Sequence, residues 1–518
     1  MLLLKKGIPQ ERRFRVKNKN NRILRKRKRK IAERLERKQW ANQKRPMFAA
    51  RNIEYEMAER TRAIDCGGIG AFHVMAQKLG LIEALDDHVK LLKQHVPYHE
   101  SDHVLNIAYN TLTGGTCLDD IELHRNDEAF MDALGAQRIP DPTTAGDFTR
   151  RFSSHDVLLM MDAINSIRPK LWNKRLSNAE RREAIIDADG TITPTLGECK
   201  HGMDMSYNGV WSYHPLLLSL ANTAEPLFIV NRPGNRPSHD GAVEWMDRAA
   251  ALVAKSFKKV CFRGDSDFAL TKNFDRWTAE GKEFAFATDS IPKLKDIAEN
   301  LPESSWKPLK RREKRIVRTA PRRRPENVKE RIIIEREYKN IKLDSEHIAE
   351  FRYRPGACNR DYRIVVLRKN LTVEKGERKL FDDILYLFYI TNIEEMSTAE
   401  IVFFCNDRCN QENLIQQLKS GLNALRAPVG DLVSNWAYMV MASLAWTLKA
   451  WFALQVHSRK RRDALLAMEF RRFLHAVVLL PCQIVRTGRR VVYRILGYNE
   501  WVRTFLNTFG RIRRLRPA

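Results

Sequence analysis

The chain is 518 residues long, with 91 lysine and arginine against 63 aspartate and glutamate side chains, a formal net charge of +28. A hydrophobic content of 43% excludes a wholly disordered chain, and the length predicts several domains. Basic side chains concentrate at the two ends: residues 1–46 hold 19 basic and 3 acidic residues, and residues 456–518 hold 15 and 3. This distribution favours a polyanionic partner, and we expect nucleic acid.

Residues 1–64 are predicted to form a basic arm. Its segment RILRKRKRKIAERLERKQW is expected to become helical on a phosphate backbone, with DNA contacts from Lys26, Arg27, Lys28 and Arg29. Residues 65–178 carry apolar side chains at three- and four-residue spacing and are predicted to be mainly helical. A small helical DNA-binding domain has this pattern, and so does an ordinary helical bundle.

From residue 183 the pattern changes to short apolar runs that alternate with helical sequence. EAIIDADGT, HPLLLSLANTAEPLFIV, KKVCFRG and KEFAFAT are typical of strands, and SHDGAVEWMDRAAALVAKSF is typical of a helix. Such alternation predicts an α/β sheet with its functional groups at the strand ends. We assign residues 179–295 to the first part of this core.

Residues 296–385 interrupt the core. They begin with a basic segment, WKPLKRREKRIVRTAPRRRP, and continue with β-rich sequence that predicts an inserted antiparallel sheet. Residues 386–455 are assigned to the second part of the core. Ser397 and Glu400 there match a capping box, and the helix they begin is expected to continue through CNDRCNQENLIQQLK. Residues 456–518 are predicted to form a basic helical region.

The longest apolar run, residues 433–455, is interrupted by Asn435 and Lys449. This pattern predicts a buried helix rather than a membrane span. Eight cysteines without a CxxC pair indicate free thiols in a reducing compartment, and the N-terminus shows no apolar stretch of signal length. We therefore expect a cytoplasmic, nucleoid-associated protein with no membrane partner.

Carboxylates end two of the predicted strands, and one lies on the later helix; these are Asp187, Asp189, Asp265, Asp267 and Glu412. Singly, an aspartate at a strand end is commonly a turn former or a helix cap. Together, such carboxylates can hold a pair of Mg²⁺ ions for phosphoryl displacement, and hard oxygen ligands suit Mg²⁺ or Mn²⁺ rather than zinc. Helical spacing places Arg408 and Lys419 on the face of Glu412.

Several motifs resemble bacterial insertion-sequence DDE transposases. Residues 405–419 resemble the Tyr-x2-Arg-x3-Glu-x6-Lys signature of one branch, with Cys405 in place of the tyrosine. DADGT and RGDSDF resemble the two aspartate motifs of that branch, and GMDMSYNGVWSYHPL and NRPGNRPSHDGA resemble insertion-sequence family thirteen-eighty. The resemblance covers residues 65 to 455.

The resemblance implies an α/β fold whose RNase H-like core is a mixed sheet with flanking helices. It implies that Asp189, Asp265 and Glu412 are catalytic and hold two Mg²⁺ ions. Asp189 is preferred because it precedes Gly-Thr, and Asp265 because it is the first carboxylate after VCFR. Asp187 and Asp267 remain the alternates.

The resemblance also suggests DNA contacts. Arg408 and Lys419 are expected to touch phosphates near the cut. Trp306 is expected either to stack on a displaced base or to pack inside the insertion. The arginines 322–324, Arg322, Arg323 and Arg324, are expected to grip transposon ends or to form a loop.

The implied protein is a transposase that binds terminal inverted repeats of double-stranded DNA, cuts a strand, and joins the 3′-OH to target DNA as a homodimer. Two other interpretations stay open: a non-catalytic DNA-binding protein, architectural or decayed, and an RNase H-like nuclease without strand transfer. The three carboxylates count against the first alternative. The sequence does not separate the second from transposition.

Overall fold

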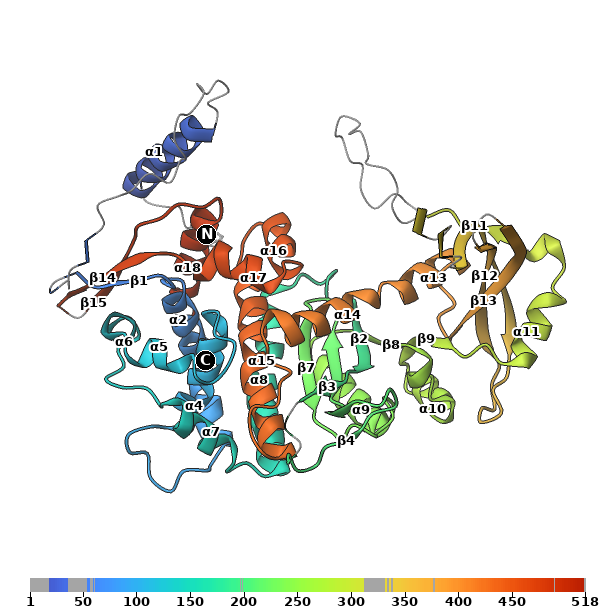
Figure 1. The fold of residues 1–518 in the computed structure, drawn as a ribbon, viewed down its shortest axis with the longest axis horizontal. Helices are drawn as coiled ribbons and strands as arrows, with labels where there is room; N and C mark the ends of the chain where they lie inside the picture. The colour runs from blue at the N-terminus through green and yellow to red at the C-terminus, as the bar shows by residue number, and fades with distance from the viewer. Residues whose placement is uncertain are drawn as a thin grey trace, which may run out of the picture.

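The computed structural model describes most of the chain (Figure 1). The described residues are 18–35, 54–55, 59, 61–195, 197, 199–311, 331–332, 335–336, 339–375, 378–488 and 490–516. Figure 1 shows long strands on the right, a group of helices and a C-terminal hairpin on the left, and two long helices between them.

Five strands form the core part of a nine-stranded sheet: β2 (Glu183–Gly190), β6 (Leu216–Leu220), β7 (Glu225–Val230), β8 (Lys259–Gly264) and β9 (Glu283–Thr288). β8 lies parallel to β2 and β9 parallel to β8, while β6 and β7 form antiparallel pairs on the other side. Because β2 and β8 are parallel, their carboxyl ends lie at the same edge of the sheet. This mixed sheet with flanking helices agrees with the predicted α/β class.

The β-rich segment is not a separate sheet. Its strands are β10 (Lys307–Pro308), β11 (Lys339–Tyr353), β12 (Tyr362–Lys375) and β13 (Arg378–Thr391), all paired antiparallel. β13 also pairs with β9, from Phe388 opposite Thr288 to Thr391 opposite Ala285. The edge of β9 would otherwise present unpaired backbone groups, so the inserted strands extend the core sheet instead of standing beside it.

Helices cover the core sheet and continue beyond it. They are α1 (Asn18–Leu35), α2 (Ile69–Leu79), α3 (Leu81–His88), α4 (Glu100–Leu112), α5 (Ile121–Arg125), α6 (Glu128–Leu134), α7 (Pro142–Thr149), α8 (Ser154–Arg175), α9 (Ala242–Val253), α10 (Phe274–Ala279), α11 (Pro292–Glu299) and α15 (Leu432–Leu454). α15 packs against β7, α8 and α4, and α8 also packs against α3 and α9. The helices before residue 178 therefore share one core with the sheet that follows, across the predicted domain boundary.

Helix α15 is the predicted buried helix. Within the described residues it alone has the length and apolar composition of a membrane span, and its apolar window is wholly buried in the protein. A polar cluster joins it to α8 and β7: the Glu225 carboxylate pairs with Arg168 and accepts hydrogen bonds from Nε1 of Trp172 and Trp451, each at 2.8 Å. Because a buried charge is costly without a partner, this cluster fixes how the three elements meet.

The C-terminal region is less helical than its sequence suggested. It contains α16 (Arg459–Leu466), α17 (Phe470–Phe473) and α18 (Val502–Ile512), but also the hairpin β14 (Cys482–Thr487) and β15 (Arg490–Ile495). β14 pairs with β1 (Ala63–Ile64), so the two ends of the globular part meet. At this contact a Cβ on Gly67 would lie 2.2 Å from Cys482 Sγ, which only glycine avoids.

A second small sheet branches from the core between β2 and β6. It consists of β3 (Thr193–Pro194), β5 (Trp211–Tyr213) and β4 (Asp204–Met205), in that order. The last segments are α13 (Thr398–Asn406) and α14 (Cys409–Gln416), followed by a π-helical turn, Gln417–Gly421.

Candidate active site

Strand β2 brings two aspartates to the sheet edge, and their surroundings differ. Asp187 is buried and forms a two-point ion pair with Arg263 of β8, with Nε to Oδ1 at 2.6 Å and Nη2 to Oδ2 at 2.9 Å. The two residues are register partners in the parallel pair. Asp187 is therefore neutralised inside the sheet, and Asp189 is left as the carboxylate at the strand end, with 14% of its side chain exposed.

The second aspartate motif follows β8 at the same edge. Asp265 caps a short 3₁₀ turn, Ser266–Phe268, and its carboxylate accepts a hydrogen bond from the backbone N–H of Asp267 at 3.1 Å. Asp267 itself is exposed. The parallel arrangement of β2 and β8 thus places Asp265 beside Asp189, as the strand-end pattern predicted.

The helix that carries Glu412 is broken, contrary to the predicted continuous helix. The capping box of Ser397 and Glu400 is present at the start of α13, which ends at Asn406, and α14 starts again after Arg408. Asparagine and aspartate are poor helix formers, and they occupy positions 406 and 407. Arg408 lies at this break, directly before the first residue of α14.

Arg408 contacts all three candidate carboxylates. Its Nη1 lies 3.3 Å from Asp189 Oδ2 and 3.7 Å from Asp265 Oδ2, and its Nη2 lies 3.0 Å from Glu412 Oε1. Residues from two strands and a helix, far apart in sequence, therefore surround one guanidinium. Within the described residues no three His, Cys, Asp or Glu side chains stand in a metal-binding arrangement. The three carboxylates are instead spread around this cation.

Burial raises the pKa of the two aspartates, and neighbouring carboxylates add to the effect. The pKa of Asp189 is raised to about 7, first by burial and then by the charges of Asp265 and Glu412, against the opposing effect of Arg408. Burial also raises the pKa of Asp265, again opposed by Arg408. Three carboxylates also lie around a single guanidinium, which favours binding of additional cations.

Sequence reasoning missed two residues that position this site. The first is Arg263, the partner of Asp187. The sequence could have indicated this pair, because an arginine within the apolar strand KVCFRG is expected to be buried and to require an acidic partner. Gln411 is buried on α14 and donates from Nε2 to the carbonyl oxygens of Asp187, at 3.0 Å, and Leu217, at 3.3 Å. It fastens the helix of Glu412 to strands β2 and β6.

Lys419 lies in the π-helical turn, close to the carboxylates. Its Nζ donates to Thr191 Oγ1 at 3.2 Å and to the Ile192 carbonyl at 2.7 Å, just past the end of β2. Burial lowers the pKa of this lysine. Cys405, in place of the signature tyrosine, is buried in α13, where burial raises the pKa of its thiol to about 12 and keeps it neutral.

The sequence matches the transposase DDE domain, group 1, over residues 61–517. The chain belongs to this transposase family. No curated protein matches the sequence. Among solved structures, the cryo-EM structure of a piggyBac transposase synaptic complex with hairpin DNA is similar over 80% of this chain and 82% of that one, with 10% identity and a TM-score of 0.35. Membership of the family indicates an enzyme that cuts and transfers DNA with a divalent metal.

The residues predicted to contact DNA outside the core of the transposase differ in their exposure and in their contacts. Trp306 is only 8% exposed, and the guanidinium of Arg368 lies 4.3 Å from its ring centre, so here it packs. In α1, Lys26, Lys28 and Arg29 are exposed, whereas Arg27 donates to the carbonyls of Ile495 and Gly497, at 3.1 and 2.6 Å. The arginines 322–324 lie outside the described residues.

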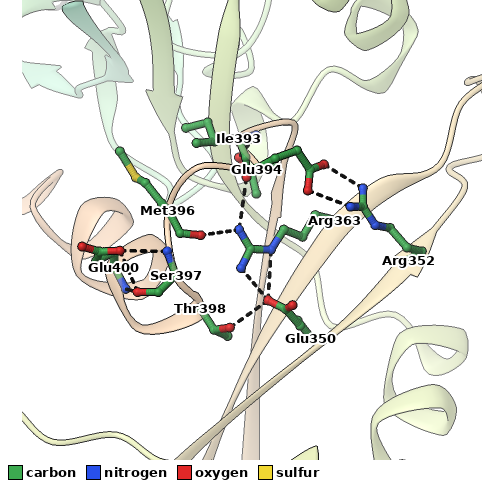
Figure 2. Close-up of polar contacts among 10 residues, drawn as sticks. Glu350, Arg352, Arg363, Ile393, Glu394, Met396, Ser397, Thr398 and Glu400 are labelled. Carbon is green, nitrogen blue, oxygen red and sulfur yellow. Dashed lines mark hydrogen bonds and ion pairs between the residues drawn. The ribbon is translucent and has the colours of Figure 1, made fainter.

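A buried arginine joins the transposase's inserted strands to the start of α13 (Figure 2). Arg363 of β12 donates to the carbonyls of Ile393 and Met396, at 3.1 and 2.6 Å, and pairs with Glu350 of β11. Thr398, in the first turn of α13, donates to the same Glu350 carboxylate at 2.7 Å. The inserted sheet thereby sets the direction of the helix that leads to Glu412.

Arg363→Met is expected to lower the free energy of unfolding by about 2–4 kcal/mol, because it leaves buried carbonyls without donors. Arg352→Met is the matched control: Arg352 pairs with Glu394 in the same region, but both side chains are more than half exposed, so its loss should cost under about 1 kcal/mol. Urea denaturation of both variants measures the difference. Equal losses would show that Arg363 is no more important than a surface pair.

Proposed function

We propose that this chain cuts DNA at the ends of a mobile element and joins the freed 3′-OH to target DNA. The observation that carries this is the convergence of Asp189, Asp265 and Glu412 on Arg408 at the carboxyl edge of two parallel strands. The mixed sheet with flanking helices supports an RNase H-like core. The Arg408–Glu412 spacing supports assignment to the Tyr-Arg-Glu-Lys signature branch, and the segments GMDMSYNGVWSYHPL and NRPGNRPSHDGA support assignment to insertion-sequence family thirteen-eighty.

The three carboxylates have the donor chemistry of the divalent metal that the family implies, although in this structure they are held by Arg408 and not in a metal-binding arrangement. They supply hard oxygen ligands, and all three lie around the single guanidinium of Arg408 at the sheet edge. Asp189, Asp265 and Glu412 would hold two Mg²⁺ ions, or Mn²⁺ in their place. Such a pair of ions, when bound, activates an attacking oxygen and stabilises a leaving oxygen.

The other side chains of the site bind and orient the DNA. Arg408 and Lys419 would contact DNA phosphates near the cut. Asp187 pairs with Arg263 and so helps to keep β2 and β8 in register. The 19 basic side chains of residues 1–46 provide the sequence-independent attraction to the duplex. Because two element ends must be handled together, we propose a homodimer in the DNA complex.

The test is strand transfer with pre-cleaved end DNA taken from the sequence that flanks the gene, in the presence of Mg²⁺. Glu412→Gln is expected to lower joining by about a thousandfold or more while DNA binding, measured by gel shift, stays unchanged. Undiminished joining by this variant would contradict the site assignment. Cutting without joining by the wild-type protein would identify a nuclease instead.

A further inference from the structure

The small sheet β3-β5-β4 carries an unusual exposed aromatic tip. In the hairpin from Asp204 to Tyr213, Tyr207 is 87% exposed, Met205 50% and Trp211 37%. Met205 and Trp211 are opposite each other in the β4–β5 pair, and opposite residues of an antiparallel pair point to the same face. Tyrosine and tryptophan normally bury most of their apolar surface, so an exposed pair on one short hairpin indicates a binding surface.

The turn that presents Tyr207 is held by its own hydrogen bonds. Ser206 N–H donates to the Val210 carbonyl at 2.9 Å, Val210 N–H donates to Ser206 Oγ at 3.1 Å, and Gly209 N–H donates to the Ser206 carbonyl at 2.9 Å. Gly209 takes a φ of 76°, which glycine adopts without strain. The exposed ring therefore stands on an ordered turn, and binding through it would cost little conformational entropy.

The base of the hairpin is fixed to its surroundings. A Cβ on Gly234 would lie 2.3 Å from the Asp204 carbonyl and 2.5 Å from that of Ser212, so the loop around Gly234 packs directly on the small sheet. The only carboxylate of the hairpin, on Asp204, accepts a hydrogen bond from the Met205 N–H at 2.7 Å.

A short segment joins the hairpin to the sheet edge that carries the candidate carboxylates. β3 follows β2 almost directly, and Leu216, which pairs with Gly190, is five residues after Trp211. A fully extended chain of that length spans at most about 18 Å. Lys419 contacts Thr191 and Ile192 between the two places, at the link from β2 to β3. A nucleic-acid strand that runs between the aromatic tip and the carboxylates can therefore pass Lys419 on the way.

We propose that the hairpin Asp204–Tyr213 stacks on unpaired nucleobases of the DNA strand that leads into the active site. The occupant is a single strand because flat aromatic side chains bind the faces of bases, which pairing and stacking hide in a duplex. Lys419, whose Nζ contacts Thr191 and Ile192 at the link from β2 to β3, supplies a positive charge for the phosphates of that strand. This inference rests on the proposed function, since it assumes that DNA enters the site.

The test compares an oligothymidine of about 16 nucleotides with an abasic strand of the same length, which has the same phosphates but lacks bases. The wild-type full-length chain is expected to bind oligothymidine roughly tenfold or more tighter at fixed salt. Tyr207→Ala combined with Trp211→Ala should remove most of that preference and leave binding of the abasic strand unchanged. Leu123→Ala, at another strongly exposed apolar side chain, is the control and should preserve the preference.

Three results would overturn the proposal. A double variant that keeps the wild-type preference would show that the tip does not meet bases, while the proposed function would stand. A double variant that changes from dimer to monomer in sedimentation would show that a second copy of the chain covers the tip. Binding of neither single strand by a wild-type protein that still shifts duplex end DNA would overturn the hairpin proposal alone, whereas loss of binding to the duplex as well would remove the proposed function.

Discussion

Asp189→Asn is expected to abolish metal-dependent cutting and joining of DNA, by about a thousandfold or more, in a protein that remains folded. The amide removes a negative ligand from the proposed metal site, but position 189 has no dedicated partner in the sheet: its contact with Arg408, at 3.3 Å, is shared with two other carboxylates. Plasmid cleavage in Mg²⁺ and circular dichroism together measure both effects.

Asp187→Asn is the matched control, two residues earlier on the same strand. This change takes the charge partner from buried Arg263, so the free energy of unfolding should fall by about 3–5 kcal/mol. Activity of the fraction that remains folded should persist. If the Asp187 variant were stable and inactive while the Asp189 variant stayed active, the assignment of the two aspartates would be reversed.

Asp189→Asn and the wild type should also differ in how their free energy of unfolding depends on pH. An unfolded aspartate loses its proton near pH 4, whereas the folded Asp189 has a pKa of about 7. Between these values the folded state binds the extra proton, so this residue makes the protein less stable as pH rises, by about 2–4 kcal/mol in total. In EDTA, Asp189→Asn should therefore gain stability over the wild type from pH 5 to pH 8. A constant difference would contradict the raised pKa.

Arg408→Gln should lower the free energy of unfolding of the metal-free protein. It should also increase the stabilisation that Mg²⁺ provides. Asp189, Asp265 and Glu412 lose their shared cation, and their mutual repulsion then favours a divalent ion that no longer competes with a guanidinium. A tenfold higher affinity for Mg²⁺ corresponds to about 1.4 kcal/mol more stabilisation at saturating Mg²⁺. Thermal unfolding with and without Mg²⁺ measures this gain. DNA cleavage should nevertheless fall, by about a hundredfold, because Arg408 is a proposed phosphate contact.

Arg276→Gln controls for the loss of any arginine between acidic side chains. Arg276 pairs with Asp247 and Glu280, neither of which is a candidate site residue. Its removal should leave the Mg²⁺ response as in the wild type. An Arg408 variant that responds to Mg²⁺ no more than this control would show that Arg408 and the metal do not compete.

Local sequence patterns predicted many elements of the fold. The capping box at Ser397 starts α13, the apolar run at 433–455 is the buried helix α15, and the strands of the α/β core occur where alternation with helices placed them. These succeeded because capping and hydrophobic periodicity depend on near neighbours in the chain. The hairpin β14–β15 was missed because its strands are short and basic, and their pairing with β1 joins residues more than four hundred positions apart.

The sequence by itself determined the charge distribution, the positions of the acidic residues at strand ends, and the spacing of Arg408 and Glu412. Only the tertiary structure separated Asp187 from Asp189. A strand repeats every two residues, so both aspartates point to the same face, and their difference lies in the neighbouring strand, where Arg263 meets one of them. The tertiary structure also joined the inserted strands to β9 and turned Arg408 toward three carboxylates. Charge pairing and strand pairing are long-range contacts, and their energies depend on burial and partners that no local pattern specifies.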